Sequence, residues 1–226
     1  MIKNWKATAC LSTPLAFDPP AFDALLEWEL ARRMGMKHHN KLTRDIPLFQ
    51  IKRVPIPLAQ RTINEHDVYC CSDPILPPPR AEWSDHQAKR IETHKIALLL
   101  DSTQRRSLLI GSGPYKMRYV PVRVRLVDCV IWFFRGDKKE VNKLLKSVIG
   151  LGKHRNIGYG LIDRWEYEET PEDYSITVLC RGKPVLMKTI PTGPQLEGLT
   201  GYRKSFGGAF PPYWHPETYM EIAVPC

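Results

Sequence analysis

The sequence predicts an α+β protein whose main domain is ferredoxin-like, with the RRM-like βαββαβ order of strands and helices. Two observations predict this class: strand-like and helix-like segments follow one another in that order, and a glycine-rich loop leads from the second helix into the last strand. We expect the domain to occupy residues 1–169, with an insertion at about 57–120. Residues 170–226 are expected to form a β-rich extension packed on it, because they show strand patterns and no helical one.

The first strand and the first helix have clear local patterns. Residues 3–11 alternate in polarity, with Trp5, Ala7 and Ala9 on one side, as a half-buried strand requires. The helix is expected from about residue 21 to residue 34, because Asp18 and the two prolines after it supply an acceptor side chain and a fixed φ. Gly35 should end it.

The second strand is predicted over residues 48–56, and its prolines confine it to a sheet edge or a strand end. Prolines are frequent in the segment that follows, and the chain has 20 in all, about twice the usual share of roughly 5%. We therefore expect an insertion between the second and third strands. Whether residues 91–110 form a hairpin or a helix and a loop stays open at this point.

The third strand and the second helix are expected next to each other. Residues 121–134 read as one strand, whose first half alternates apolar residues with Arg123 and Arg125 and whose second half is wholly apolar. Asp137 and Glu140 have the spacing of a capping box, and the apolar residues after them form one helical stripe up to Ile149. A fourth strand is predicted over residues 159–167.

Composition narrows the class of partner. Lys and Arg number 33 against 24 Asp and Glu, a net charge of +9, which favours a polyanionic partner over an acidic small molecule. A solvated basic surface is the alternative. The six cysteines contain no CxxC pair, so neither a zinc ribbon nor a disulfide scaffold is indicated. No apolar run approaches the roughly 18 to 20 residues of a membrane span, and we expect a cytoplasmic protein without metal or cofactor.

The glycine-rich loop, residues 150–160, does not have the pattern of a nucleotide-binding loop. A dinucleotide fingerprint follows a strand and opens a helix, whereas this loop follows a helix and opens a strand. A P-loop needs Ser or Thr after its lysine, but Lys153 is followed by His154. Both classes of nucleotide site are therefore excluded.

A nucleic-acid backbone fits the loop better. Glycine amides approach phosphate oxygens closely, and basic side chains beside them supply charge. The alternative is a glycine-rich turn with no ligand. The candidate RNA-binding residues of the loop are Gly150, Gly152, Lys153, His154, Arg155, Asn156, Gly158 and Tyr159. The basic segment with Lys37, His38 and His39 either complements the dipole of the preceding helix or faces a phosphate backbone, and both interpretations stay open.

No catalytic residues are predicted. The acids of residues 163–173 lack ligand spacing and are interpreted as solvated surface. The seven histidines would allow metal-free RNA cleavage, although no pair is singled out by its context. A metal-independent endoribonuclease therefore remains an alternative.

Three stretches carry a resemblance to a known family. A ferredoxin-like domain with a glycine-rich loop before its fourth strand resembles the RAMP superfamily of CRISPR-associated proteins. Two further segments look most like the Cas five-type subunit of type IV effector complexes: Pro14–Asp18 with Phe22–Leu26, and Gly207–Trp214.

The resemblance implies a non-catalytic RNA-binding subunit of an antiviral ribonucleoprotein complex. Such a subunit grips the 5′ handle of the crRNA, caps the filament of backbone subunits beside the large subunit, and serves guide-directed DNA targeting with a possible contact to the target duplex. Proteins of this family carry an inserted thumb between the second and third strands, where this chain has residues 57–120. Further RNA contacts that the resemblance implies are Lys116, Arg118, Arg123 and Arg125 along the handle path, and Arg105 and Arg106 at the thumb tip. The alternatives are an endoribonuclease that processes CRISPR repeat RNA and a basic assembly protein without direct RNA contact.

Overall fold

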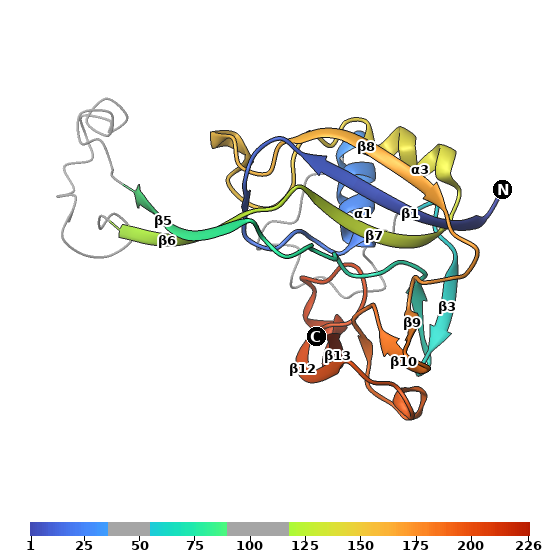
Figure 1. The fold of residues 1–226 in the computed structure, drawn as a ribbon. Helices are drawn as coiled ribbons and strands as arrows, with labels where there is room; N and C mark the ends of the chain where they lie inside the picture. Colours follow the sequence, from blue (N-terminus) through green and yellow to red (C-terminus); the bar gives the residue numbers. More distant parts are fainter. Residues whose placement is uncertain (36–54, 90–117) are drawn as a thin grey trace, which may run out of the picture.

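The core of the protein is a three-stranded antiparallel sheet with two helices on one face (Figure 1). The computed structural model describes residues 1–35, 55–89 and 118–226. In the sheet, β1 (Lys3–Leu11) lies between β7 (Cys129–Gly136) and β8 (Ile162–Glu169). The helices are α1 (Phe22–Arg33) and α3 (Lys138–Leu145).

Large apolar side chains fill the space between this sheet and the helices. Trp132 and Phe134 of β7 are buried and contact Phe22 of α1, with ring centroids 5.6 and 5.1 Å apart. Ala7 and Ala9 of β1 are fully buried beside them, and their small side chains leave room for these rings. The alternation of the first strand thus places its small residues under the helices, as its sequence predicts.

Several local predictions are confirmed. The first strand has the predicted bounds, and the first helix is one residue shorter at each end. Asp137 caps α3, because its side chain accepts hydrogen bonds from the backbone N–H groups of Lys139 at 2.9 Å and Glu140 at 3.4 Å. The last strand of the core begins at Ile162, three residues later than expected.

The predicted ferredoxin-like fold is wrong. The described residues form mostly β structure, with two α-helices and several small antiparallel sheets. The predicted strand over residues 121–134 is in fact two strands in two different sheets, β6 (Arg118–Leu126) and β7. Residues 48–54 of the predicted second strand lie outside the described residues. Its last two residues, Pro55 and Ile56, are not in a strand. Isolated bridges from Leu58, Cys71 and Ile75 occupy the outer edge of β7 instead.

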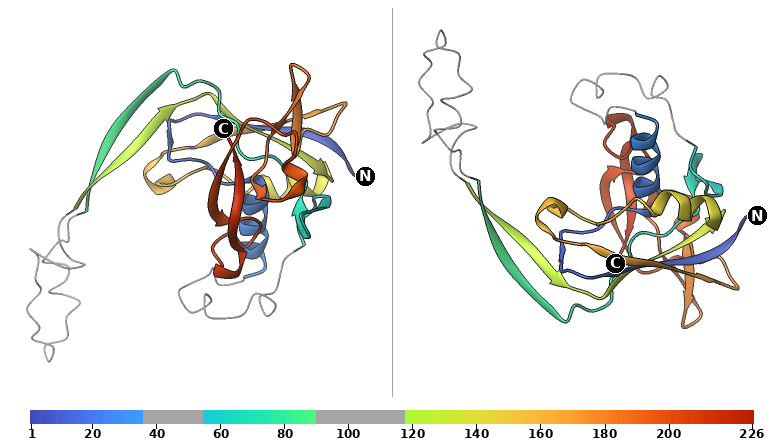
Figure 2. Two further views of the ribbon diagram at one scale, coloured as in Figure 1. Left: turned by 90° about the horizontal axis from the view of Figure 1, so that it is seen from below. Right: turned by 90° about the horizontal axis from the view of Figure 1, so that it is seen from above.

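A long two-stranded arm projects from the core. It pairs β5 (Ala81–Lys89) with β6, and the short β2 (Leu15–Ala16) adds to β6 at the base. Figures 1 and 2 show the arm extending away from the rest of the molecule. Both of its faces meet solvent over most of its length, which explains why Ala81–Lys89 lacks the alternation of a half-buried strand.

The remaining strands build a second core below the first. A hairpin of β3 (Gln60–Ile63) and β4 (His66–Tyr69) packs with a hairpin of β9 (Thr177–Cys180) and β10 (Lys183–Leu186). A third sheet has the order β11-β13-β12, and Ile190 and Ala223 from it are buried in the same cluster. Its strands are β11 (Ile190–Pro191), β12 (Tyr202–Gly208) and β13 (Tyr219–Pro225). The C-terminal residues therefore pack around a second core, separate from the first, and residues 63–70 contribute side chains to it.

A buried ion pair joins the two cores. Lys188 donates a hydrogen bond to Asp23 of α1 at 2.9 Å, and both side chains are fully buried. Tyr213 donates to the same carboxylate, 2.8 Å from its Oδ2. Since a buried charge is tolerated only when it is paired and hydrogen-bonded, this cluster fixes how the C-terminal part packs against α1.

The described residues include no helix long and apolar enough to cross a membrane. All six cysteines are free.

Candidate nucleic-acid interface

The glycine loop runs between α3 and β8, and backbone hydrogen bonds hold it against the base of the arm. Lys153 N–H donates to the carbonyl of Ala16 at 3.2 Å, and Gly160 N–H donates to that of Pro14 at 2.8 Å. Leu151 N–H donates to the carbonyl of Gly160 at 2.8 Å and closes the loop. The loop is thereby a fixed part of the surface between the core and the arm.

Two of the loop glycines are required by contacts with the chain itself. A Cβ on Gly152 would lie 2.5 Å from the carbonyl oxygen of Ala16, and one on Gly160 would lie 2.2 Å from that of Leu151. Both residues also have positive φ, of 73° and 64°. Gly158 has φ 96°, and a Cβ added there would meet nothing within 4 Å, so its requirement is the turn alone. The turn interpretation of the glycines therefore accounts for these three positions.

The basic side chains of the loop lie over aromatic rings at its surface. The Nζ of Lys153 is 4.7 Å from the ring centroid of Phe17, and the guanidinium carbon of Arg155 is 5.0 Å from that of Trp28. Both side chains are exposed, and neither forms an ion pair with a residue that the structure describes. Cation–π contacts orient these cations without neutralising their charge.

The neighbouring loop residues complete this surface. His154 has a left-handed backbone, φ 62°, and its ring centroid is 5.6 Å from that of Phe17. Asn156 is exposed in a short 3-10 turn, Arg155–Ile157. A cavity of about 240 Å³ lies beside the turn, between α1 and Gly150–Gly152, with Trp28 and Arg155 in its wall.

Tyr159 ties the loop to the arm. Its hydroxyl donates a hydrogen bond to Asp85 of β5 at 2.6 Å. This hydrogen bond lowers the pKa of Asp85, helped by the N–H of His86. The Tyr159 ring packs with Val122 and Val124 of β6, so the loop covers this face of the arm base.

The structure does not place all the arginines predicted to bind RNA on the loop side of the arm. Residues opposite each other in the β5–β6 pair share a face, so Arg118, Val122, Val124 and Asp85 lie on the loop side. Arg118 is exposed near the described end of the arm.

Arg123 and Arg125 belong to the other face, and both are neutralised. Arg123 forms an ion pair with Glu82, which raises the pKa of its guanidinium, and Arg125 pairs with Asp18. The side chain of Arg125 is 13% exposed. Alternation in β6 therefore separates these two arginines from the loop, and their contact with RNA stays a prediction.

Six other predicted contacts lie outside the described residues: Lys37, His38, His39, Arg105, Arg106 and Lys116. They stay predictions.

The aromatic side chains of the arm were not among the predicted site residues. Trp83 of β5 is 42% exposed and pairs with Val124, which places it on the loop side. Tyr119 of β6 is 62% exposed on the other side. The sequence signal for Trp83 is an aromatic residue within a polar, strand-length segment, and this segment lacks the apolar alternation that predicts a strand.

The residues described include no group of three or more metal-ligating side chains. The histidines among them are dispersed: His66 stacks on Phe210, with 5.4 Å between ring centroids, and buried His215 accepts a hydrogen bond from Glu217 N–H at 3.2 Å. The acids of β8 pair with surface cations, as Glu169 does with Lys3 at 2.7 Å and Glu168 with Lys6 at 3.0 Å. Their interpretation as solvated surface is thus confirmed for these pairs.

No protein-family model matches the chain, and no curated protein matches it.

Proposed function

We propose that the chain binds RNA through the glycine loop and the loop side of the arm. The observation that carries this proposal is the pair of exposed cations, Lys153 and Arg155, which are held over Phe17 and Trp28 without an acidic partner among the described residues. A phosphate supplies the negative charge that the surroundings lack. Asn156 adds a hydrogen-bonding group beside them.

Aromatic rings support a single-stranded ligand. Trp83 is exposed on the face of the arm against which Tyr159 packs. Bases of single strands stack on such rings, whereas duplex bases are not available for stacking. The net charge of +9 adds long-range attraction to any polyanion.

In its most specific form, the proposal is a non-catalytic subunit of a CRISPR effector ribonucleoprotein that grips the crRNA 5′ handle. Support comes from the order of α3, glycine loop and β8, and from an arm inserted in the chain before β7. The fold class no longer supports it, since the ferredoxin-like prediction is wrong. Backbone subunits, the large subunit and target DNA are partners of this form of the proposal only.

Salt-dependent binding tests the proposal. A fluorescently labelled single-stranded repeat RNA is titrated with protein at several salt concentrations, and log K is plotted against log salt. Each phosphate contact of a single strand contributes about 0.7 to the slope, so the double variant Lys153→Ala/Arg155→Ala is expected to flatten it by about 1.4. Lys183→Ala/Arg203→Ala is the matched control, because these two exposed cations lie on the C-terminal strands, away from the loop (Figure 1).

Equal losses in both double variants would mean that only general charge attracts the RNA. An unchanged slope in the loop variant would leave the loop as a turn. The same RNA incubated with protein in EDTA tests the endoribonuclease alternative: we expect it to stay intact, and cleavage at one site would favour the enzyme.

A further inference from the structure

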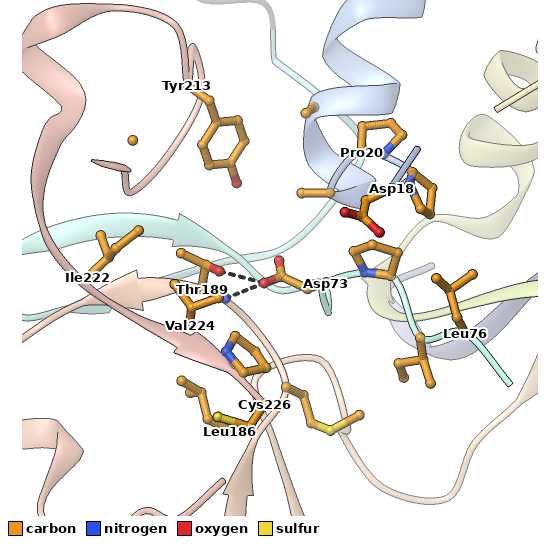
Figure 3. A pocket seen from close by; sticks show the side chains of 18 of the residues that line it. Asp18, Pro20, Asp73, Leu76, Leu186, Thr189, Tyr213, Ile222, Val224 and Cys226 are labelled. Atoms are coloured by element: carbon orange, nitrogen blue, oxygen red, sulfur yellow. Dashed lines mark hydrogen bonds between the residues drawn. The ribbon is translucent and has the colours of Figure 1, made fainter. Parts of the chain in front are cut away.

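A second and larger cavity lies between α1 and the C-terminal strands. Its volume is about 870 Å³, and Figure 3 shows it bordered by the start of α1, residues 73–76, β10 and β13. Most of its wall is apolar, as at Leu76, Leu186, Ile222 and Val224. The described residues of the wall include no Lys, Arg or His, although the chain as a whole carries a charge of +9. This wall does not suit RNA.

Asp73 is one of the polar residues that line the cavity. Its Oδ2 accepts two hydrogen bonds from Thr189, from the backbone N–H at 2.9 Å and from the hydroxyl at 2.6 Å. Figure 3 shows this pair in the wall, with the second carboxylate oxygen directed away from Thr189. That oxygen accepts no hydrogen bond from the described part of the chain, and Asp73 forms no ion pair there. Burial raises the pKa of this carboxyl group.

Two other carboxylates near the cavity are already paired. Asp18 is paired with Arg125, and Asp23 beneath the wall is paired with Lys188. Tyr213 lines the cavity, and its hydroxyl donates to Asp23. Among the described residues, Asp73 is left as a half-satisfied carboxylate at the edge of an apolar space.

We propose that this cavity binds an apolar chain that ends in an ammonium group, with the ammonium on the free oxygen of Asp73. A partly buried carboxylate is stabilised by an opposite charge that also donates hydrogen bonds. The volume falls within the range of about 300 to 1,000 Å³ that is usual for small-ligand sites. The same chemistry occurs in a lysine side chain between apolar residues of a partner polypeptide and in a free aliphatic amine.

Three ligands of equal length separate charge from apolar fit: n-hexylammonium, n-hexanol and n-hexanoate. Binding is followed by NMR on protein with ¹³C-labelled methionine methyl groups, because Met187 lines the cavity, and Met187→Leu assigns its signal. We expect hexylammonium to bind about tenfold more tightly than hexanol, as one charged hydrogen bond allows, and hexanoate to bind more weakly than both. Butylammonium should bind more weakly than hexylammonium, by about fourfold for each methylene that the cavity no longer buries.

Asp73→Asn should reduce hexylammonium to the affinity of hexanol and leave hexanol unchanged. Asp67→Asn, at an exposed position of β4 outside the cavity, is the matched control. The comparison of the three ligands on the unaltered chain decides the proposal even if Asp73→Asn fails to fold. Equal affinities for hexylammonium and hexanol, tightest binding of hexanoate, or no shift at Met187 would each overturn it.

The capped tripeptide acetyl-Leu-Lys-Leu-amide distinguishes the two sources. Tighter binding than hexylammonium supports a lysine of a partner polypeptide, and weaker binding supports a free amine. The outcome of this experiment is independent of RNA binding, because neither Lys153 nor Arg155 lines the cavity.

Discussion

Replacing Glu29 by Gln is expected to weaken the contact between α1 and α3. The carboxylate of Glu29 is fully buried and accepts hydrogen bonds from Arg32 Nε at 2.8 Å, from Arg33 Nε at 2.8 Å and from the hydroxyl of Ser147. Arg33 in turn donates to the carbonyl of Lys143 at 2.6 Å, in the last turn of α3. The carboxylate therefore holds the arginine that satisfies the end of the other helix.

The lowered pKa of Glu29 gives the size of the expected loss in the free energy of unfolding. Burial alone would raise it, but the hydrogen bonds from Arg32, Ser147 and Arg33 outweigh burial and lower it from 4.5 to about 2. A difference of about 2.5 units corresponds to about 3.4 kcal/mol at 1.36 kcal/mol per unit. The two arginines are 47% and 37% exposed, and water screens their attraction, so we expect a loss of about 2 kcal/mol.

The pH dependence follows from the direction of this shift. A carboxyl group whose folded pKa is lowered stabilises the fold fully above its unfolded pKa of 4.5, and this stabilisation is lost as the pH falls toward about 2. Urea unfolding followed by tryptophan fluorescence should show a gap of about 2 kcal/mol between the two proteins at pH 7 and a clearly smaller gap at pH 2.5. Glu140→Gln, which removes an exposed pair with Lys143, should change stability by less than about 0.5 kcal/mol. A gap that is the same at both pH values would refute the reasoning.

Four further substitutions probe the glycine loop, the buried ion pair and the cap of α3. Gly152→Ala should cost about 2 to 3 kcal/mol in thermal unfolding, because its Cβ would lie 2.5 Å from a carbonyl oxygen at positive φ. Gly158→Ala should cost only about 1 kcal/mol, and equal losses would contradict this account of the loop. Lys188→Ala leaves Asp23 buried without its cation and should cost about 3 to 5 kcal/mol in urea unfolding, whereas a neutral result would mean that water enters the cluster. Asp137→Ala should lower the free energy of unfolding by about 1 kcal/mol through the lost helix cap, and an unchanged melting temperature would speak against that cap.

Elements whose pattern is local could be predicted from the sequence. The first strand has the expected bounds because apolar residues recur at every second position from Trp5 to Leu11. Asp137 is a helix cap because its acceptor oxygen lies within two or three residues of the N–H groups that it satisfies.

The break between β6 and β7, where the chain leaves one sheet and enters another, could not be predicted from a local pattern. The chain passes from β6 to β7 at Val127 and Asp128, and both strands are rich in β-branched and aromatic residues. The change from alternating to continuous apolar residues was visible, but it does not say that the two halves pair with different strands. That depends on partners distant in sequence, since β6 pairs with β5 and β7 with β1.

Contacts between residues distant in sequence also limited the prediction of the candidate site. The glycine loop was located from its composition, but the contact that requires Gly152 is made with Ala16, far away in the sequence. The neutralisation of Arg125 by Asp18 is equally long-range. Sequence alone therefore identified the basic side chains and could not tell which of them remain without an acidic partner.

Photo-crosslinking tests RNA binding by the loop most directly. Single-stranded repeat RNA with 4-thiouridine at successive positions is irradiated with the intact protein, and the crosslinked peptides are identified by mass spectrometry. The account predicts crosslinks in residues 150–160 and in β5, at Tyr159 and Trp83 above all, and their loss from the loop in the Lys153→Ala/Arg155→Ala variant. Crosslinks confined to the C-terminal strands β12 and β13, or unchanged by that variant, would contradict it.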